Sequence, residues 1–477
     1  MRRGRRGAGI AHSPRPTHLR GRVRYASAVR HRDEWITGGV PFIRTTTPRP
    51  TQSAPRYPCF DGLRAIAAIS VVGVHTTFVS GFTGRSGLGR YTSRLEIGVS
   101  VFFVISGFLL YRPFAVAHFR GTPAPDARRF WVRRLRRIIP AYWVAFLVVS
   151  YVLQADTVRH AWWSLPIYLG FAQIYLPNYT LTGITQAWSV CTEMTFYLTL
   201  PLWATLMGRL GAAGPSSRRR PAGPFRRHRH RPAAHPRRPV DTQLRVELAG
   251  LASLVVVGLA YRIWVLQMHT SLSTTMPNWL PGFVDLFALG MLLAVVSAYL
   301  AQTDHRPAWL WHPALPWASW ALAAGAFVAV GNIRLPLIPI YQSPVGISLV
   351  RQTLYGLFAL FLVLPAVFGP QDRGLLRGLL RAQPVALIGL VSYGVYLWHE
   401  AALMLFLRWT GDHLFRIPLW QLFGAVGGMA LLAATASYVV VERPALRGRR
   451  RGRSAALPAP APVPVPVPTT GTLAASR

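Results

Sequence analysis

Residues 60–78 read FDGLRAIAAISVVGVHTTF, an apolar stretch of membrane-spanning length that contains one histidine, His75. An imidazole inside such a stretch is costly in a bilayer, so by default it marks a functional site. Arg64 precedes His75 by eleven residues, which places both side chains on nearly the same helix face, about 16 Å apart along the axis. The stretch therefore predicts a transmembrane helix with a basic anchor near one membrane surface and a titratable base near the midplane.

Composition places the whole chain in the membrane class. Apolar residues make up 51% of the 477 residues, the net charge is +38, and every basic residue is arginine. The arginines gather in the head, the tail and the connections between apolar runs, which is the positive-inside pattern and not a nucleic-acid-binding surface. The two cysteines, Cys59 and Cys191, have no metal-type spacing, and we expect neither a metal site nor a disulfide framework.

Ten apolar runs predict an all-α polytopic membrane protein with about ten transmembrane helices. The runs are 63–82, 97–115, 138–155, 186–207, 248–268, 281–300, 316–332, 348–369, 385–407 and 419–441. A further apolar piece, residues 162–176, is shorter than a span, and we expect a short re-entrant or interfacial segment there.

Arginine density sets the expected orientation. The connections 112–137 and 208–247 are both rich in arginine and should both face the cytoplasm, which requires an even number of spans between them. Runs 138–155 and 186–207 supply two. The same count predicts a plasma-membrane protein with both termini in the cytoplasm, and it leaves the arginines of loop 83–96 outside as an exception.

Segments of biased composition divide the chain. Residues 1–57 are rich in arginine and lack the apolar region of a signal peptide, so we expect a disordered cytoplasmic head. Residues 58–446 form the membrane domain, and its Arg-, His- and Pro-rich loop 208–247 is expected to be disordered. Residues 447–477 pass from Arg-rich to Pro- and Ala-rich sequence and predict a disordered tail.

Position alone leaves two roles for His75. A neutral imidazole can accept a proton from a hydroxyl, and its ordinary pKa near 6.5 suits a general base. A structural histidine that forms a hydrogen bond between helices would occupy the same kind of position.

Residues 128–140 read RRFWVRRLRRIIP and form a second candidate cluster. Arg133 with Arg136, and Arg134 with Arg137, are spaced i,i+3, so each pair points to one face of a helix that enters the membrane. Guanidinium groups suit phosphate oxygens. An ordinary topogenic cluster at the lipid headgroups would carry the same charge.

Residues 186–197, QAWSVCTEMTFY, place Glu193 inside a span, where an unpaired carboxylate is expensive. Glu193 can hold a partner side chain or hydrogen-bond a sugar hydroxyl, or it can pair with a buried residue such as Arg262. Residues 392–400, SYGVYLWHE, place a second histidine in a span. Their aromatic residues suit a sugar-binding cleft, or an aromatic belt at the membrane interface.

The order of these motifs resembles that of the membrane acyltransferase-3 family. The resemblance is carried by FDGLRA at 60–65 with His75, VFFVISGFL at 101–109, the block 133–140, Trp188-Ser189 with Glu193 and Phe196-Tyr197, and residues 392–399. It covers about residues 57–446. It implies a ten-span enzyme that moves an acyl group, most simply acetyl, from cytoplasmic acyl-CoA to a hydroxyl of a carbohydrate or glycosylated metabolite. Acyl-CoA would be the donor substrate, and no bound cofactor is implied.

The resemblance also suggests roles for residues. We expect His75 and Glu193 to be catalytic. We expect five arginines to bind the donor: Arg64, Arg133, Arg134, Arg136 and Arg137. Four residues are expected to contact the acceptor: Trp188, Ser189, Tyr393 and His399.

The sequence departs from the family pattern at two places, and there is one alternative to the acyltransferase function. Met194 stands where the family usually has a second acidic residue, and Cys191 and Thr192 replace a small and apolar pair. A proton-coupled transporter or flippase for a glycan or small molecule, with His75 and His399 in a proton relay, is the alternative from a different class.

Overall fold

A computed structural model describes residues 57–153, 162–212, 240–268, 270–303, 307–333, 336–337, 343–411 and 414–447. Over these ranges the chain is helical and contains no strand. The all-α class is therefore confirmed. Almost all of the predicted head and tail lies outside the described residues, as does 213–239 of the predicted loop.

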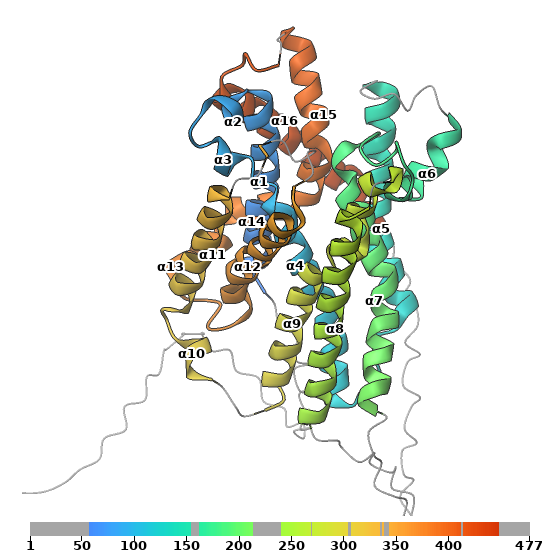
Figure 1. The fold of residues 1–477 in the computed structure, drawn as a ribbon, viewed down its shortest axis with the longest axis vertical. Coiled ribbons are helices and arrows are strands. Elements are labelled where there is room, and N and C mark those ends of the chain that lie inside the picture. The colour runs from blue at the N-terminus through green and yellow to red at the C-terminus, as the bar shows by residue number, and fades with distance from the viewer. Residues whose placement is uncertain are drawn as a thin grey trace, which may run out of the picture. The chain divides into compact units, whose positions relative to one another are not determined.

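The helices fall into a long and a short set (Figure 1). The long helices are α1 (Cys59–Val79), α4 (Ile97–Arg120), α5 (Ala127–Leu147), α7 (Trp188–Ala212), α8 (Val240–Leu266), α9 (Val284–Leu300), α11 (Leu315–Asn332), α12 (Val345–Val367), α15 (Ser392–Thr410) and α16 (Leu419–Ser437). The short helices are α2 (Phe82–Arg85), α3 (Gly89–Thr92), α6 (Leu165–Leu169), α10 (Ala308–Trp311), α13 (Leu375–Arg381), α14 (Gln383–Leu390) and α17 (Arg443–Arg447).

Each predicted span falls on one of the long helices, except 385–407, which falls on α14 and α15. In the described part of the chain, 6 helices are long and apolar enough to cross a membrane, and a bent pair makes up to 7. One of the others, α9, has 17 residues and is shorter than a typical span. The count of ten spans stays a prediction. Residues 162–176 form only short helical turns, as expected for a segment that does not span.

The predicted span 385–407 is wrong as one continuous helix. It consists of α14 and α15, which are bent by 72° with respect to each other. The bend follows from how α14 packs: a β-carbon on Gly389 would collide with the backbone carbonyl of Asp61, so α14 lies directly against the start of α1. Beyond the bend, α15 packs along α16 and against α1.

The loop predicted at 208–247 is shorter than expected, because α7 continues to Ala212 and α8 begins at Val240. Residues 240–247 of this predicted loop are helical, and Glu247 links α8 to α4. The fully buried Glu247 carboxylate accepts a hydrogen bond from the Tyr111 hydroxyl at 2.5 Å and pairs with His118 Nδ1 at 2.6 Å.

Close helix packing depends on small residues at one crossing in particular. Helix α4 makes its most extensive contact with α9, and α8 packs beside α9 (Figure 1). A β-carbon on Gly107 would collide with the Phe287 carbonyl oxygen, and one on Gly290 would collide with the Val104 carbonyl oxygen. The two backbones therefore approach as closely as they do because both positions are glycine.

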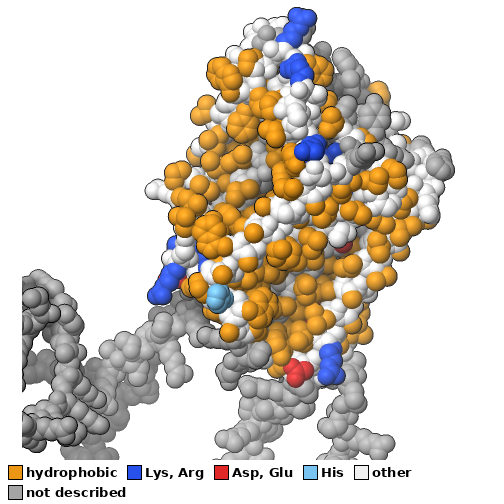
Figure 2. Space-filling view, turned by 60° about the vertical axis from the view of Figure 1, so that its left-hand side comes forward, with side chains coloured by type: hydrophobic (Ala, Val, Ile, Leu, Met, Phe, Trp, Pro, Cys, Tyr) orange, Lys and Arg blue, Asp and Glu red, His pale blue; other side chains and the backbone are white. Residues whose placement is uncertain are grey.

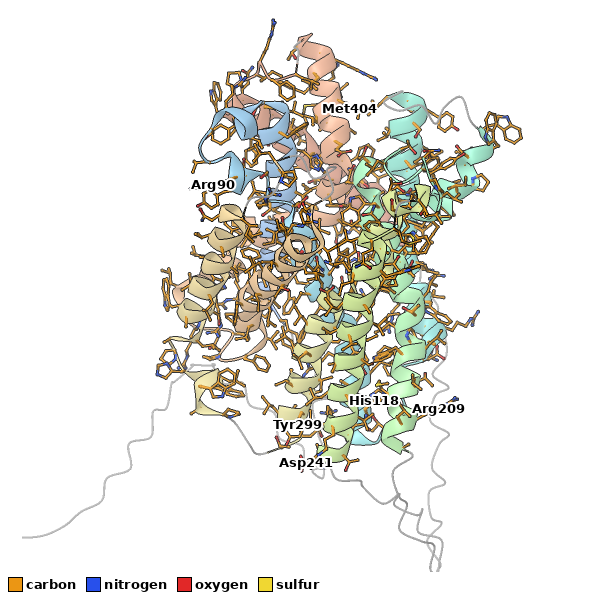
Figure 3. The ribbon with its side chains drawn as sticks, viewed as in Figure 1. Arg90, His118, Arg209, Asp241, Tyr299 and Met404 are labelled. Carbon is orange, nitrogen blue, oxygen red and sulfur yellow. The ribbon has the colours of Figure 1, made fainter. Side chains whose placement is uncertain are left out.

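The outer surface fits a bilayer. Figure 2 shows hydrophobic side chains over most of the visible face, with charged side chains mainly toward its two ends. Large apolar residues such as Val256, Leu202 and Leu432 are more than half exposed. In Figure 3, Arg209 and Asp241 lie at one end of the bundle, and Arg90 lies well away from them in the opposite half. This arrangement agrees with the predicted opposite sides of connections 208–247 and 83–96.

We expect Gly290→Ala to lower the free energy of unfolding by about 1–3 kcal/mol, because the added methyl group must push α9 away from α4. The matched control is Gly325→Ala in α11, where the added methyl group meets no atom within 4 Å. Thermal unfolding of the purified proteins in detergent measures both. Equal midpoints for the two variants would contradict the packing argument.

Candidate active site

Helix α1 carries both Arg64 and His75. The Arg64 guanidinium lies 3.2 Å from the Asp61 carboxylate, one turn earlier on the same helix. Further along α1, His75 faces α15: its Nδ1 lies 3.4 Å from Glu400 Oε1, and its ring centroid lies 5.0 Å from that of His399. The two ends of α1 therefore contribute to two separate groups of polar side chains.

The first group surrounds a cavity of about 90 Å³. Its basic lining residues are Arg64, Arg134 and Arg137. Its other polar lining residues come from α4, α7 and α15, and they are Ser106, Ser189, Glu193, Tyr197, Ser392, Tyr393 and Tyr396. The cavity thus combines three guanidinium groups with hydroxyl groups and one carboxylate.

The arginine block of α5 divides between two faces, as its i,i+3 spacing predicts. Arg134 and Arg137 are half-buried and line the cavity, whereas Arg133 and Arg136 are exposed. Two of the four α5 arginines expected to bind the donor are therefore placed to reach a ligand in this cavity. The other two face away from it.

The carboxylate in the cavity has a partner on α4. The Ser106 hydroxyl donates a short hydrogen bond to Glu193. Arg262, considered above as a partner of Glu193, instead pairs with Asp285 at 3.8 Å. That alternative is wrong, because Asp285 lies closer to Arg262 and is held in place by Gln352 through hydrogen bonds of 3.0 Å.

Residues expected to contact the acceptor differ in placement. Ser189 and Tyr393 line the cavity. Trp188 is stacked on Phe283 with ring centroids 5.4 Å apart and is not among the cavity-lining residues. His399 is fully buried outside the cavity, beside His75.

One residue connects the two groups. Tyr396 lines the cavity, and its ring centroid lies 6.0 Å from that of His399. Its hydroxyl lies 2.7 Å from Ser189 Oγ and donates to the Gln186 carbonyl at 2.8 Å. Tyr396 is therefore the contact between the arginine-lined cavity and the histidines.

Comparison with known proteins identifies the family. A family model described as an acyltransferase domain matches residues 57–439. The chain belongs to the acyltransferase-3 family. This confirms the resemblance on which the sequence-based assignment rested.

Two kinds of relative are similar to part of the chain. The acyltransferase MdmB of Streptomyces mycarofaciens is 32% identical over 165 residues, 32% of this chain and 41% of that protein. The O-acetyltransferase OatA of Staphylococcus aureus is 30% identical over 173 residues, and the peptidoglycan O-acetyltransferase OatA of Listeria monocytogenes is 29% identical over 167 residues. The chain covers 26% and 25% of these two proteins. No solved structure matches it.

The motifs predicted no role for five polar residues of this site. Ser106, Tyr197, Ser392 and Tyr396 belong to motifs quoted above, and Glu400 ends one of them. For Glu400 a signal was present, because a carboxylate next to a histidine within a span is costly unless it is paired. Its partner His75 lies on another helix, so spacing could not reveal the pair.

Gln186 lies in the short turn Thr185–Ala187 before α7 and links this turn to α15 beside the site. We expect Gln186→Leu to lower the free energy of unfolding by about 1–3 kcal/mol. Its buried side-chain amide donates to the Tyr396 and Leu397 carbonyls, both at 3.0 Å. Thermal unfolding in detergent measures the loss. Thr199→Val is the control, since the exposed Thr199 hydroxyl bonds only within α7. A Gln186 variant as stable as the control would show that the link is not needed.

Proposed function

We propose that this protein is an integral membrane O-acyltransferase. It moves an acyl group, most simply acetyl, from cytoplasmic acyl-CoA to a hydroxyl of a carbohydrate or glycosylated metabolite. The observation that carries the proposal is the pairing of an arginine-lined cavity with a histidine–glutamate cluster, joined through Tyr396. Membership of the acyltransferase-3 family and similarity to the O-acetyltransferase OatA support it.

Arg64, Arg134 and Arg137 would hold the phosphates of coenzyme A. Guanidinium groups match phosphate oxygens through paired, charge-assisted hydrogen bonds. The three arginines line one cavity although they come from two helices. The predicted topology, with both termini inside, would put this cavity toward the cytoplasm, where acyl-CoA is available.

His75 would take the proton from the attacking hydroxyl. Its imidazole faces the Glu400 carboxylate at 3.4 Å, which would orient the ring and stabilise its protonated form. The hydroxyl oxygen then bonds to the thioester carbonyl carbon, and the carbon–sulfur bond breaks. The proton returns from His75 to the thiolate, so that the products are an O-acyl ester and free coenzyme A. The distance of about 16 Å between Arg64 and His75 along α1 suits the long pantetheine arm.

Glu193 would act on the acceptor side of the cavity. It is held by Ser106 and lies in the same cavity as Ser189 and Tyr393. A carboxylate accepts hydrogen bonds from sugar hydroxyls, and hydroxyl groups of serine and tyrosine can donate or accept them. This set is therefore suited to orient a polyhydroxylated acceptor.

Replacement of His75 by alanine should reduce acyl transfer at least about 100-fold, the usual contribution of a general base. The assay follows acceptor-dependent release of free coenzyme A by the purified full chain. His312→Ala is the control, because His312 is exposed and distant in sequence from the site. A folded, membrane-inserted His75→Ala protein with full transfer would rule out this mechanism. Uptake driven by a pH gradient, without thioester cleavage, would instead favour the transporter.

The two faces of the α5 block supply a matched comparison for donor binding. Arg134→Gln and Arg137→Gln should each weaken binding of coenzyme A roughly tenfold or more, because each removes a charge-assisted hydrogen bond worth about 1.5–3 kcal/mol. Arg133→Gln and Arg136→Gln should change it little, since their side chains face away from the cavity. Calorimetric titration of the four purified variants measures the difference. Equal weakening on both faces would mean that overall positive charge, and not this cavity, attracts the donor.

A further inference from the structure

His75, His399 and Glu400 form a compact group of potential metal ligands. Each offers one ligand atom, and these atoms all lie within 4.8 Å of one another. Two imidazoles and one carboxylate are a donor set that catalytic zinc sites use, with a fourth position left open. The group is assembled from two helices that are far apart in sequence, α1 and α15.

The protonation of His399 is fixed by its hydrogen bond. Nδ1 lies 2.8 Å from the Tyr396 carbonyl oxygen, which can only accept, so Nδ1 carries the proton. Nε2 then carries a lone pair. In the described part of the chain this atom is buried without a hydrogen-bond partner, and His399 is 0% exposed. A buried acceptor without a partner is costly. A proton donor or a cation bound at Nε2 would remove this cost.

The hydrogen bond that His399 makes is also one that metal-bound histidines make. Metal-bound histidines almost always donate their other ring N–H to a carbonyl or carboxylate, as His399 does to Tyr396. His399 is thus already oriented without an ion.

The spacing of His75 and Glu400 suits a shared ion better than a direct hydrogen bond. Charge-assisted N–H···O bonds are about 2.7–2.9 Å long, whereas the His75 and Glu400 atoms are 3.4 Å apart. Two ligand atoms that bind one tetrahedral zinc ion at about 2.1 Å are about 3.4 Å apart. The longest separation in the group, 4.8 Å, would have to shorten by a rotation of the side chains.

We propose that His75, His399 and Glu400 form a binding site for a divalent transition-metal ion, and that Zn²⁺ at this site blocks acyl transfer. The site is partly accessible, because the side chains of His75 and Glu400 are 35% and 13% exposed. A neutral imidazole has one nitrogen lone pair. An ion that binds it leaves His75 unable to accept a proton. The inhibitory part of the proposal rests on the proposed function of His75, whereas the binding part does not.

Metal binding is tested without any turnover. The purified full chain is stripped with a chelator and titrated with Zn²⁺ in a calorimeter, and with Co²⁺ while its visible absorption is recorded. We expect one site of higher affinity, with the intense Co²⁺ absorption typical of tetrahedral coordination. His399→Gln and Glu400→Gln should each weaken it at least about tenfold. Glu400→Gln is nearly isosteric with the unchanged side chain, so it tests the site even if the variant of the buried His399 folds poorly.

His312→Gln is the control for exposed histidines, and it should keep the affinity of the unchanged protein. Equal Zn²⁺ affinity in all four proteins, or no binding, would overturn the proposal. In the transfer assay, Zn²⁺ should inhibit over the concentrations at which it binds, and a chelator should restore activity. Acceleration by Zn²⁺ would overturn the inhibitory role. If the unchanged protein transferred no acyl group, the proposed function would fail while the binding result stood.

Discussion

The cost of leaving a polar group unpaired in apolar surroundings governs how these helices are arranged. Three carboxylates within the helices show it. Glu193 is held by Ser106, Glu247 by groups on α4, and Asp285 by Gln352. In each case the partner lies on a different helix, so each hydrogen bond also fixes a helix pair. Polar side chains therefore specify which helices meet, while apolar side chains supply most of the contact area.

Helix α1 is the element on which the site depends. It packs against α4, α12, α13, α14, α15 and α16. Small residues allow this: a β-carbon on Gly62 would meet the Leu380 backbone, and Gly98 of α4 lies equally close to the Ala67 carbonyl. Because α1 is fixed along its length, Arg64 and His75 are fixed with it. Their relative placement follows from helix geometry alone, which is why one short stretch of sequence could predict it.

Much of the fold followed from the sequence because membrane helices are specified by local length and apolarity. The two faces of the arginine block followed from i,i+3 spacing for the same reason. The bend between α14 and α15 did not follow from the sequence. It lies where Gly389 contacts the backbone of Asp61, a residue distant in the sequence. The pairing of His75 with Glu400 could not be predicted either, because contacts between helices distant in sequence leave no periodic pattern in it. The family resemblance suggested Trp188 as an acceptor contact, and its ring is stacked on Phe283 and does not line the cavity.

Helix α15 contributes residues both to the arginine-lined cavity and to the cluster of His75, His399 and Glu400. Tyr393 and Tyr396 line the cavity, and His399 and Glu400 meet His75. The positions 393, 396 and 400 are spaced by three and four residues, so they lie on one face of the helix. From 393 to 400 this face rises about 10 Å. A polar face of that length, set in an otherwise apolar helix, has no role in packing against lipid. It runs instead from the cavity to the histidines, so that one face of α15 connects the two groups of polar side chains.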